Sequence, residues 1–369
     1  MKKIAIIHYM PLEYYPPVTN FLNVISKHAF FVKVWTTHNT KKRFTYHNEK
    51  LKTINRVPFP KQSDKVLKRL FKYFCFNISC FIELVKYKPE AIMYYESYSV
   101  YPVFLYMIFF GKATNLYIHY HEYEDQENYR NGMKLVKYYH KLEKKFLYQK
   151  ATWISQTNKD RINMFALDHP KLPSGILKVI PNYPPKDWLR HTNLKKPDGH
   201  TVIKTVYVGS LSLKDTFIKE YCAWIAAHNG KVHFHIYAYN LHDDTKTYLK
   251  SLKSDYIVFY PKGVEYSEMP TLLANYDIGL ILYKAHTNNY KYNAPNKLFE
   301  YLVCGLNVLY PDVMLGVKPY ESSKVRSVNF KKIPSLQTII AYFSNASLPV
   351  GQYVAEDALE EILDELEKI

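Results

Sequence analysis

A lysine and a glutamate three residues apart, Lys297 and Glu300, form the pair whose chemistry is most specific. Their spacing places both on one side of a helix predicted over 296–304. The first turn of a helix has free backbone N–H groups and a positive end, which attract phosphate. Lys297 can neutralise a diphosphate, and Glu300 can accept two hydrogen bonds from ribose hydroxyls. The simpler alternative is a surface ion pair on a helix that packs against the core.

Strands and helices alternate along both halves of the chain around this helix. In the first half, strands are expected at 3–9, 30–36, 91–95, 115–119 and 151–155, with helical stretches between them. After the proline-rich segment 180–185 the pattern restarts, with strands expected at 203–208, 232–239, 257–259, 278–283 and 307–310. This alternation predicts an α/β protein of two parallel β-α-β domains. We place the domains at 1–185 and 186–355, with a terminal helix at 356–369 that could pack back on the first domain.

Basic residues are concentrated in the first half. The chain carries a net charge of +17. Residues 1–185 hold 29 Lys and Arg against 13 Asp and Glu, whereas residues 186–369 hold 21 against 20. Anionic lipid, nucleic acid or a plain bias toward lysine would each account for such a surface. Because no recognised nucleic-acid motif accompanies it, we expect an anionic membrane surface as partner and no nucleic acid.

One long helix, expected from about Ser63, combines apolar and basic side chains. Its apolar stripe comprises Leu67, Leu70, Phe71, Phe74, Ile78, Phe81 and Val85, and Lys65, Lys68, Arg69 and Lys72 lie mostly off it. Two interpretations stay open. The stripe could face the core with the basic side chains in solvent, or part of the helix could lie at a membrane interface.

The cysteines and the apolar runs bear on location. Four cysteines without paired spacing predict reduced thiols and a cytoplasmic protein. The apolar run at 4–9 is too short for a signal peptide. The longest apolar stretch, 98–110, contains Pro102, and a spanning helix needs roughly 20 residues. We therefore expect no transmembrane segment and a peripheral position at the inner face of the cell membrane.

Four segments in order resemble GT-B glycosyltransferases, in particular the retaining family-four group and a divergent surface-polysaccharide type. The strongest is the Pro-x-Lys-x-x-Glu-Tyr helix at 295–301, followed by Gly305 and a strand. The others are His119-Tyr120-His121-Glu122, the interdomain segment 179–182, and the turn 208–211. The resemblance covers nearly the whole chain and implies two Rossmann-like domains that face a central cleft, with the acceptor bound by the first and the nucleotide sugar by the second.

The resemblance also implies roles for individual residues. Glu300 would bind the donor ribose, and Lys297 with Lys214 the diphosphate. Gly209 and Ser210 would approach the phosphates, and Gly263 and Val264 would lie against the base. Asn296, at the start of the helix, would also belong to the nucleotide site. His121 would face the transferred sugar, with His119 as an alternative contact. Catalysis would rest on His121 and Lys297, without a metal or other cofactor, and the co-substrate would be a UDP or GDP sugar.

The chain departs from the family pattern in three places. Tyr292 stands where family-four enzymes commonly have a second glutamate, Ser210 stands where an arginine is usual, and the stretch 10–17 lacks glycine. These changes affect the sugar side of the donor site and the handling of the acceptor. The implied activity is transfer of a hexose, with retention, to a glycan or lipid-linked saccharide in polysaccharide biosynthesis.

Other activities receive less support. The chain has no Asp-x-Asp of the kind that metal-dependent transferases use, and no glycine pattern of a P-loop or dinucleotide-binding protein. Two alternatives remain: a nucleotide-sugar epimerase on the same scaffold, and a non-catalytic basic module that binds anionic membrane or nucleic acid.

Overall fold

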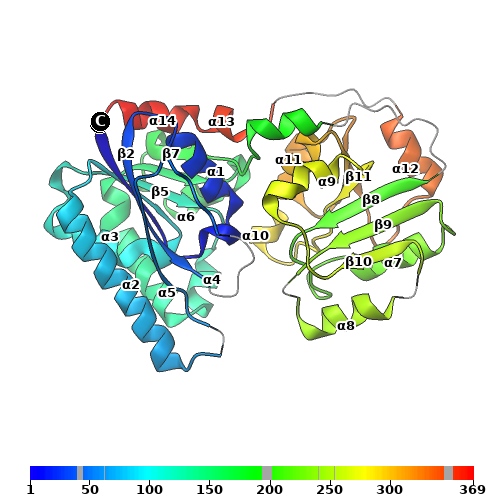
Figure 1. Cartoon of the computed structure of the whole chain (residues 1–369), viewed down its shortest axis with the longest axis horizontal. Coiled ribbons are helices and arrows are strands. Elements are labelled where there is room, and N and C mark those ends of the chain that lie inside the picture. The colour runs from blue at the N-terminus through cyan, green and yellow to red at the C-terminus, as the bar shows by residue number, and fades with distance from the viewer. Residues whose placement is uncertain (40–44, 62, 193–201, 240, 253, 345–351) are drawn as a thin grey trace. The chain divides into compact units, whose positions relative to one another are not determined.

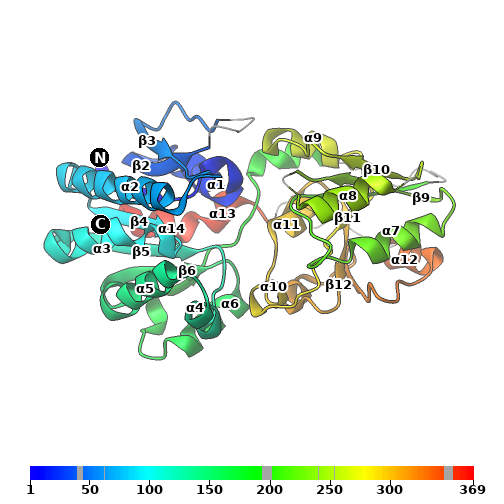
Figure 2. The same cartoon turned by 90° about the horizontal axis from the view of Figure 1, so that it is seen from below.

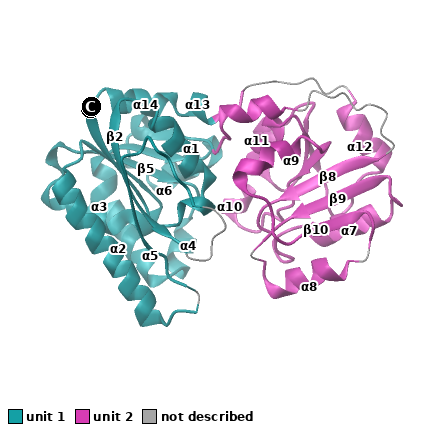
Figure 3. Cartoon of the chain, viewed as in Figure 1, with its two compact units in different colours: residues 1–181, 355–369 teal, residues 182–354 magenta. Residues whose placement is uncertain are grey.

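The computed structural model describes residues 1–39, 45–61, 63–192, 202–239, 241–252, 254–344 and 352–369 (Figure 1). The chain forms two compact units (Figure 3). Unit 1 consists of Met1–Pro181 together with Ala355–Ile369, and unit 2 consists of Asn182–Val354. The polypeptide thus leaves unit 1 inside the proline-rich segment and returns to it for the last helices.

The core of unit 1 is a seven-stranded parallel sheet in the order β3-β2-β1-β4-β5-β6-β7. Its strands are β1 (Lys2–His8), β2 (Phe30–His38), β3 (Thr53–Pro58), β4 (Ala91–Tyr95), β5 (Asn115–Tyr120), β6 (Ala151–Gln156) and β7 (Leu177–Val179). The order reverses between β1 and β4, so the chain leaves these two neighbouring strands toward opposite faces of the sheet, to α1 (Pro16–Ile25) after β1 and to α3 (Val100–Phe109) after β4. Ligands of open α/β sheets bind at such a point.

Helices cover both faces of this sheet. Successive residues of β1 alternate, with Ala5 and Ile7 in one apolar cluster and Ile4 and Ile6 in the other. The first face is covered by α2 (Val66–Tyr87), α3 (Val100–Phe109), α5 (Lys134–Leu142) and α6 (Lys159–Asp168). The second face is covered by α1 (Pro16–Ile25), α13 (Ala355–Ala358) and α14 (Glu360–Glu367). A short helix, α4 (Gln126–Asn131), precedes α5.

The orientation of α2 tests the interpretation in which its apolar stripe faces the core. The residues that face the core are Tyr73, Phe76, Asn77, Cys80, Leu84 and Tyr87. The side chains at the start of the stripe, Leu67, Leu70, Phe71 and Phe74, are exposed. For this first half of α2 a core-facing stripe is wrong, because another set of apolar residues at helical spacing makes the contact with the sheet.

Unit 2 contains a six-stranded parallel sheet in the order β10-β9-β8-β11-β12-β13. Its strands are β8 (Ile203–Val208), β9 (Val232–Tyr237), β10 (Ile257–Tyr260), β11 (Ile278–Leu280), β12 (Asn307–Pro311) and β13 (Val325–Val328). Numbered within the unit, the order is 3-2-1-4-5-6, which is that of Rossmann dinucleotide-binding sheets. The switch point lies between β8 and β11.

Two layers of helices enclose the second sheet (Figure 2). On one face lie α7 (Ile218–Ala226), α8 (Asp243–Ser251) and α12 (Leu336–Phe343). On the other lie α9 (Met269–Leu273) and α11 (Asn296–Val303). A single turn, α10 (Asn288–Lys291), precedes α11. The helix predicted over 296–304 is therefore the element that packs beside the switch point of unit 2.

Candidate functional site

The turn that follows β8 brings bare backbone to the switch point of unit 2. Gly209 has a φ of 121°, a region that side chains other than that of glycine rarely adopt. Its N–H donates to the carbonyl of Tyr237 at 3.0 Å, and the hydroxyl of Tyr207 donates to the carbonyl of Ser210 at 2.6 Å. Hydrogen bonds therefore hold both sides of the turn, and Ser210 itself is exposed.

Close packing positions α11 beside this turn. A Cβ atom at Gly279 of β11 would overlap the ring of Tyr301 on α11, so only glycine permits this approach of helix to strand. The hydroxyl of Tyr301 accepts the N–H of Val208 at 3.2 Å, which ties α11 to the end of β8. The helix begins at Asn296 after Pro295. Its opening turn is consequently fixed against the β8 turn.

Lys297 extends from this opening turn to the glycine. Its Nζ would lie 3.4 Å from a Cβ atom at Gly209, and the side chain is only 6% exposed. Within the described residues, Nζ has no hydrogen-bond partner. It lies 3.9 Å from the ring centre of Tyr207 and 4.9 Å from that of Tyr283, at distances where aromatic faces attract a cation.

Glu300, one turn further along α11, is buried to the same extent. Burial raises the pKa of its carboxyl to about 7, against the lowering effect of the Lys297 charge. Burial lowers the pKa of Lys297 to about 7, against the raising effect of Glu300. Buried groups that titrate near neutral pH are typical of functional sites. Because both side chains are only 6% exposed, the simpler alternative of a surface ion pair is excluded for these two residues.

The remaining residues predicted for this site are distributed along the same sheet edge. Asn296 precedes Lys297 on α11 and is half-buried. Gly263 and Val264 follow β10, two strands from β8, where a Cβ atom at Gly263 would lie 2.8 Å from the ring of Tyr239. Lys214 is exposed, and its N–H donates to Ser212 in the loop after β8. The structure thus joins Lys297, Glu300 and the 209–210 turn, and leaves Lys214 and the 263–264 turn at separate places on the edge.

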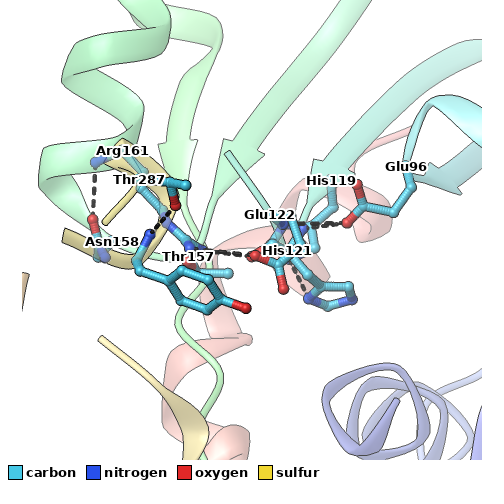
Figure 4. A network of polar contacts seen from close by, with 9 residues as sticks. Glu96, His119, His121, Glu122, Thr157, Asn158, Arg161 and Thr287 are labelled. Carbon is cyan, nitrogen blue, oxygen red and sulfur yellow. Dashed lines mark hydrogen bonds and ion pairs between the residues drawn. The ribbon is translucent and has the colours of Figure 1, made fainter. Parts of the chain in front are cut away.

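A second polar group lies at the carboxyl edge of unit 1, around His121 (Figure 4). The N–H of His121 donates to Glu96 Oε1 at 2.6 Å, and its carbonyl accepts from Arg161 Nη1 at 2.5 Å. Its ring stacks on Tyr95 at 5.3 Å and 9°. These contacts fix the backbone and the ring plane of His121 at the point where β5 ends.

Two further histidines surround His121 in the interior of unit 1. His119 Nε2 lies 3.3 Å from His121 Nδ1, and His119 Nδ1 lies 2.8 Å from Ser155 Oγ. His8, at the end of β1, has no hydrogen bond to either ring nitrogen within the described chain. Burial, then the charge of His121, holds the pKa of both His8 and His119 well below the usual value. Both imidazoles are therefore neutral near pH 7.

Glu96 is a titratable residue of this group that sequence reasoning missed. It follows β4 directly and has a φ of 61°, which is strained for a side chain of this size. Burial, then the charge of Glu122, raises its pKa to about 8. The available signal was its place immediately after an expected strand, since the carboxyl ends of parallel strands share one edge.

Metal ligands are a separate matter. In the described ranges, no group of three or more His, Cys, Asp or Glu side chains could hold a metal ion.

Both units are Rossmann-like, and together they have the fold of GT-B glycosyltransferases. No family model and no curated protein matches the sequence. Several solved structures have a similar fold. Sucrose-phosphate synthase from Thermosynechococcus elongatus gives a TM-score of 0.63 at 13% identity over 100% of this chain and 98% of that one. Anabaena HepE in complex with UDP gives a TM-score of 0.64 at 10% identity over 100% of both chains.

An epimerase matches equally well. The UDP-GlcNAc 2-epimerase from Methanocaldococcus jannaschii gives a TM-score of 0.61 at 13% identity over 100% of both chains. At these identities the similarity establishes the fold, which transferases and epimerases share, and the chemistry has to be argued from the site.

Proposed function

We propose that this protein is a glycosyltransferase that uses a nucleoside diphosphate sugar as its donor. The observation that carries the proposal is the buried ammonium of Lys297, which lacks a hydrogen-bond acceptor in the described structure and lies beside the bare backbone of Gly209. A buried charge without a partner is costly, and an anion at this turn would remove the cost. A diphosphate has the charge and the oxygen atoms to do so.

Each residue of the unit 2 edge then has a role. Lys297 and the N–H groups at 209–210 bind the diphosphate, Glu300 accepts from the ribose hydroxyls, and the turn 263–264 lies against the base. Asn296 lies at the N-terminal end of α11 beside the diphosphate, and Lys214, exposed in the loop after β8, is the second cation proposed for it. UDP is the favoured nucleotide because HepE was solved with UDP, and GDP is the alternative.

Charge stabilisation is the proposed source of catalysis. The diphosphate gains charge as the bond to the sugar breaks, and Lys297 together with the end of α11 would stabilise that charge. We propose that transfer proceeds without a metal and with retention of configuration. His121 is the proposed contact of the transferred sugar in unit 1, held in place by Glu96 and Arg161.

The acceptor and the location belong to the same proposal. The basic first half suits an acceptor presented at an anionic membrane. We propose a glycan or lipid-linked saccharide of polysaccharide biosynthesis as the acceptor, and peripheral association with the cytoplasmic face of the membrane. Within the described residues, no helix is both long and apolar enough to cross a membrane.

The donor site is tested by thermal unfolding with UDP, GDP, ADP, CMP and their sugar conjugates, with and without a divalent ion. A ligand at 100 times its Kd should stabilise the protein by about 2.7 kcal/mol. Lys297→Met and Glu300→Ala should abolish most of this shift, whereas Lys332→Met, at an exposed lysine of the same unit, should preserve it. An unchanged shift in both site variants, or no shift with any nucleotide, would contradict the proposal and favour the non-catalytic module.

Epimerisation is a second candidate, favoured by Glu96. Its carboxyl, with a pKa raised to about 8, can exchange a proton near neutral pH, as an epimerase requires. Incubation of the protein with UDP-GlcNAc and no acceptor, followed by NMR of the sugar, separates the two reactions. Inversion of configuration at a sugar carbon would identify an epimerase. A donor that stays unchanged by itself and is consumed only after an acceptor is added would identify a transferase.

A further inference from the structure

The outer side of α2 carries an apolar surface that nothing in the described part of unit 1 covers. Leu67 is 82% exposed, Leu70 50%, Phe71 65% and Phe74 57%. Their spacing of three and four residues places them on one stripe along the helix. We call these four residues the α2 surface. Single exposed apolar residues are common, but a stripe of four large ones marks an interaction site.

This stripe plays no part in holding α2 to the sheet. The helix already buries Tyr73, Phe76, Cys80 and Leu84 in the unit 1 core, together with Asn77 and Tyr87. The α2 surface is therefore a second apolar face, directed away from the core of unit 1, and its exposure has no structural explanation within that unit.

The apolar surface continues at the other end of α2. Ile82 is 45% exposed there, beside the carboxyl end of α3, where the rings of Phe81 and Phe110 lie 6.3 Å apart. Phe109 and Phe110 are 68% and 52% exposed. Two neighbouring helices thus present large apolar side chains over the length of α2.

The charges around this surface are almost all positive. Three of the segments on this face of unit 1, 66–87, 100–113 and 134–150, contain eleven lysines and arginines and only two acidic residues. One of these, Glu143, is fully buried and accepts hydrogen bonds inside the unit. The other, Glu83, is paired with Lys33 at 2.7 Å. Asp64, just before α2, is paired with Lys72 at 2.7 Å and with Lys68 at 3.2 Å, which leaves the other cations of these segments for the headgroups. An approaching surface therefore meets cations and exposed apolar side chains.

We propose that the α2 surface inserts into the interfacial region of an anionic membrane, while the surrounding lysines and arginines contact the lipid headgroups. Leucine and phenylalanine on a projecting helix suit the boundary between headgroups and acyl chains, and lysine side chains can reach the headgroups from beside them. Anionic lipid supplies the negative charge that this layer lacks. The proposal rests on unit 1 alone and holds whether or not the protein transfers a sugar.

Vesicle binding tests the apolar contribution. The probes are vesicles of phosphatidylcholine mixed with phosphatidylglycerol, and vesicles of phosphatidylcholine alone. In a co-sedimentation assay, the triple variant L67S/F71S/F74S should bind the anionic vesicles with an affinity at least about tenfold lower than that of the natural protein. The control Leu167→Ser removes an 80% exposed leucine from α6 and should bind normally. Equal binding of the triple variant and the natural protein would overturn the insertion of the stripe.

The contribution of charge needs its own variant. Lys65→Gln with Arg69→Gln removes two exposed cations next to the α2 surface, and should weaken binding to anionic vesicles and reduce the sensitivity of that binding to salt. Equal binding of the natural protein to both kinds of vesicle would overturn the requirement for anionic lipid.

Cys75 offers a direct measure of insertion. It is exposed on α2, four residues from Phe71, whereas Cys80, Cys222 and Cys304 are buried. A polarity-sensitive fluorophore on Cys75 should shift to the blue when anionic vesicles are added. An unchanged spectrum on bound protein would overturn insertion and indicate adsorption by charge alone.

Two further readouts separate this proposal from its rivals. If the α2 surface instead joined two copies of the chain, the natural protein would be a dimer without lipid and L67S/F71S/F74S a monomer, which would overturn the proposal. The stabilisation of the triple variant by UDP should equal that of the natural protein. Loss of vesicle binding with intact nucleotide binding therefore supports membrane insertion independently of the donor site.

Discussion

At Lys297, desolvation opposes the charge that the residue needs in order to bind an anion. The ammonium is supported by the faces of Tyr207 and Tyr283 rather than by hydrogen bonds, and an aromatic face replaces only part of the hydration energy. Glu300 is destabilised as a carboxylate by the same burial. Both residues are consequently poised to change protonation when a ligand arrives near pH 7.

This balance predicts a change in the sign of proton exchange with pH. A bound diphosphate raises the pKa of Lys297 and ribose hydroxyls lower that of Glu300. Both begin at about 7, so binding should take up a proton on Lys297 at about pH 8 and release one from Glu300 at about pH 6. Titration calorimetry with a UDP-sugar in buffers of different ionisation enthalpy measures the number of protons taken up or released on binding at each pH.

Single substitutions assign the two protons. Lys297→Met should remove the uptake at high pH, and Glu300→Gln the release at low pH. Proton exchange of one sign at both pH values in the natural protein would show that the two side chains do not titrate as a pair at this site.

At the scale of elements, the contact between β11 and α11 sets the position of the site. Gly279 allows the ring of Tyr301 to lie directly on the strand, and Tyr301 in turn bonds to the end of β8. The distance from Lys297 to the 209–210 turn therefore depends on Gly279, which has no side chain.

Replacing Gly279 by alanine should destabilise unit 2 by roughly 2 kcal/mol, since the new methyl group must displace a fully buried tyrosine. Nucleotide affinity should fall as well, because α11 has to shift. Gly175→Ala is the control, because a Cβ atom there meets nothing within 4 Å. Denaturant unfolding and UDP titration check both effects, and a G279A variant with normal stability would show that α11 can adjust without cost.

Most elements follow from periodicity, and the exceptions have identifiable causes. The strand β3 escapes prediction because Thr53–Pro58 is a partly exposed edge strand without alternation. On α2 the spacing correctly indicates an apolar stripe. It cannot show which of two apolar faces packs, because Tyr73, Phe76 and Leu84 have helical spacing too.

The site was predictable only where neighbours in sequence are neighbours in space. The i, i+3 relation brings Lys297 and Glu300 together, but the surroundings of Lys297 include Tyr207 of β8 and Tyr283 from the segment after β11. Glu96 meets His121 only because β4 and β5 lie side by side in the sheet. Contacts of this kind depend on strand order, which local spacing does not encode.

At the scale of the whole molecule, unit 1 is assembled from two distant parts of the chain. Residues of α14, among them Ile362, Leu363 and Leu366, lie in the same apolar cluster as Ile4 and Val18. The last helix therefore completes the core of the first unit, and its contribution should appear in the stability of that unit alone.

Leu363→Ala should destabilise unit 1 by about 2–5 kcal/mol, as expected for truncation of a buried leucine. Hydrogen exchange should quicken at the amides of β1 and stay unchanged at those of β8. Leu167→Ala, at an exposed position, is the control. Equal acceleration in both sheets would mean that the two units unfold as one.

The return of the chain to unit 1 also orders events during synthesis. When the ribosome has finished residues 1–181, the face of the first sheet that carries Ile4 and Val18 still lacks α13 and α14, which are translated only after the whole of unit 2. Domains generally fold in turn as they emerge. Here the second unit can close first, while the nascent first unit keeps an uncovered apolar face that chaperones can bind until translation reaches the final helices.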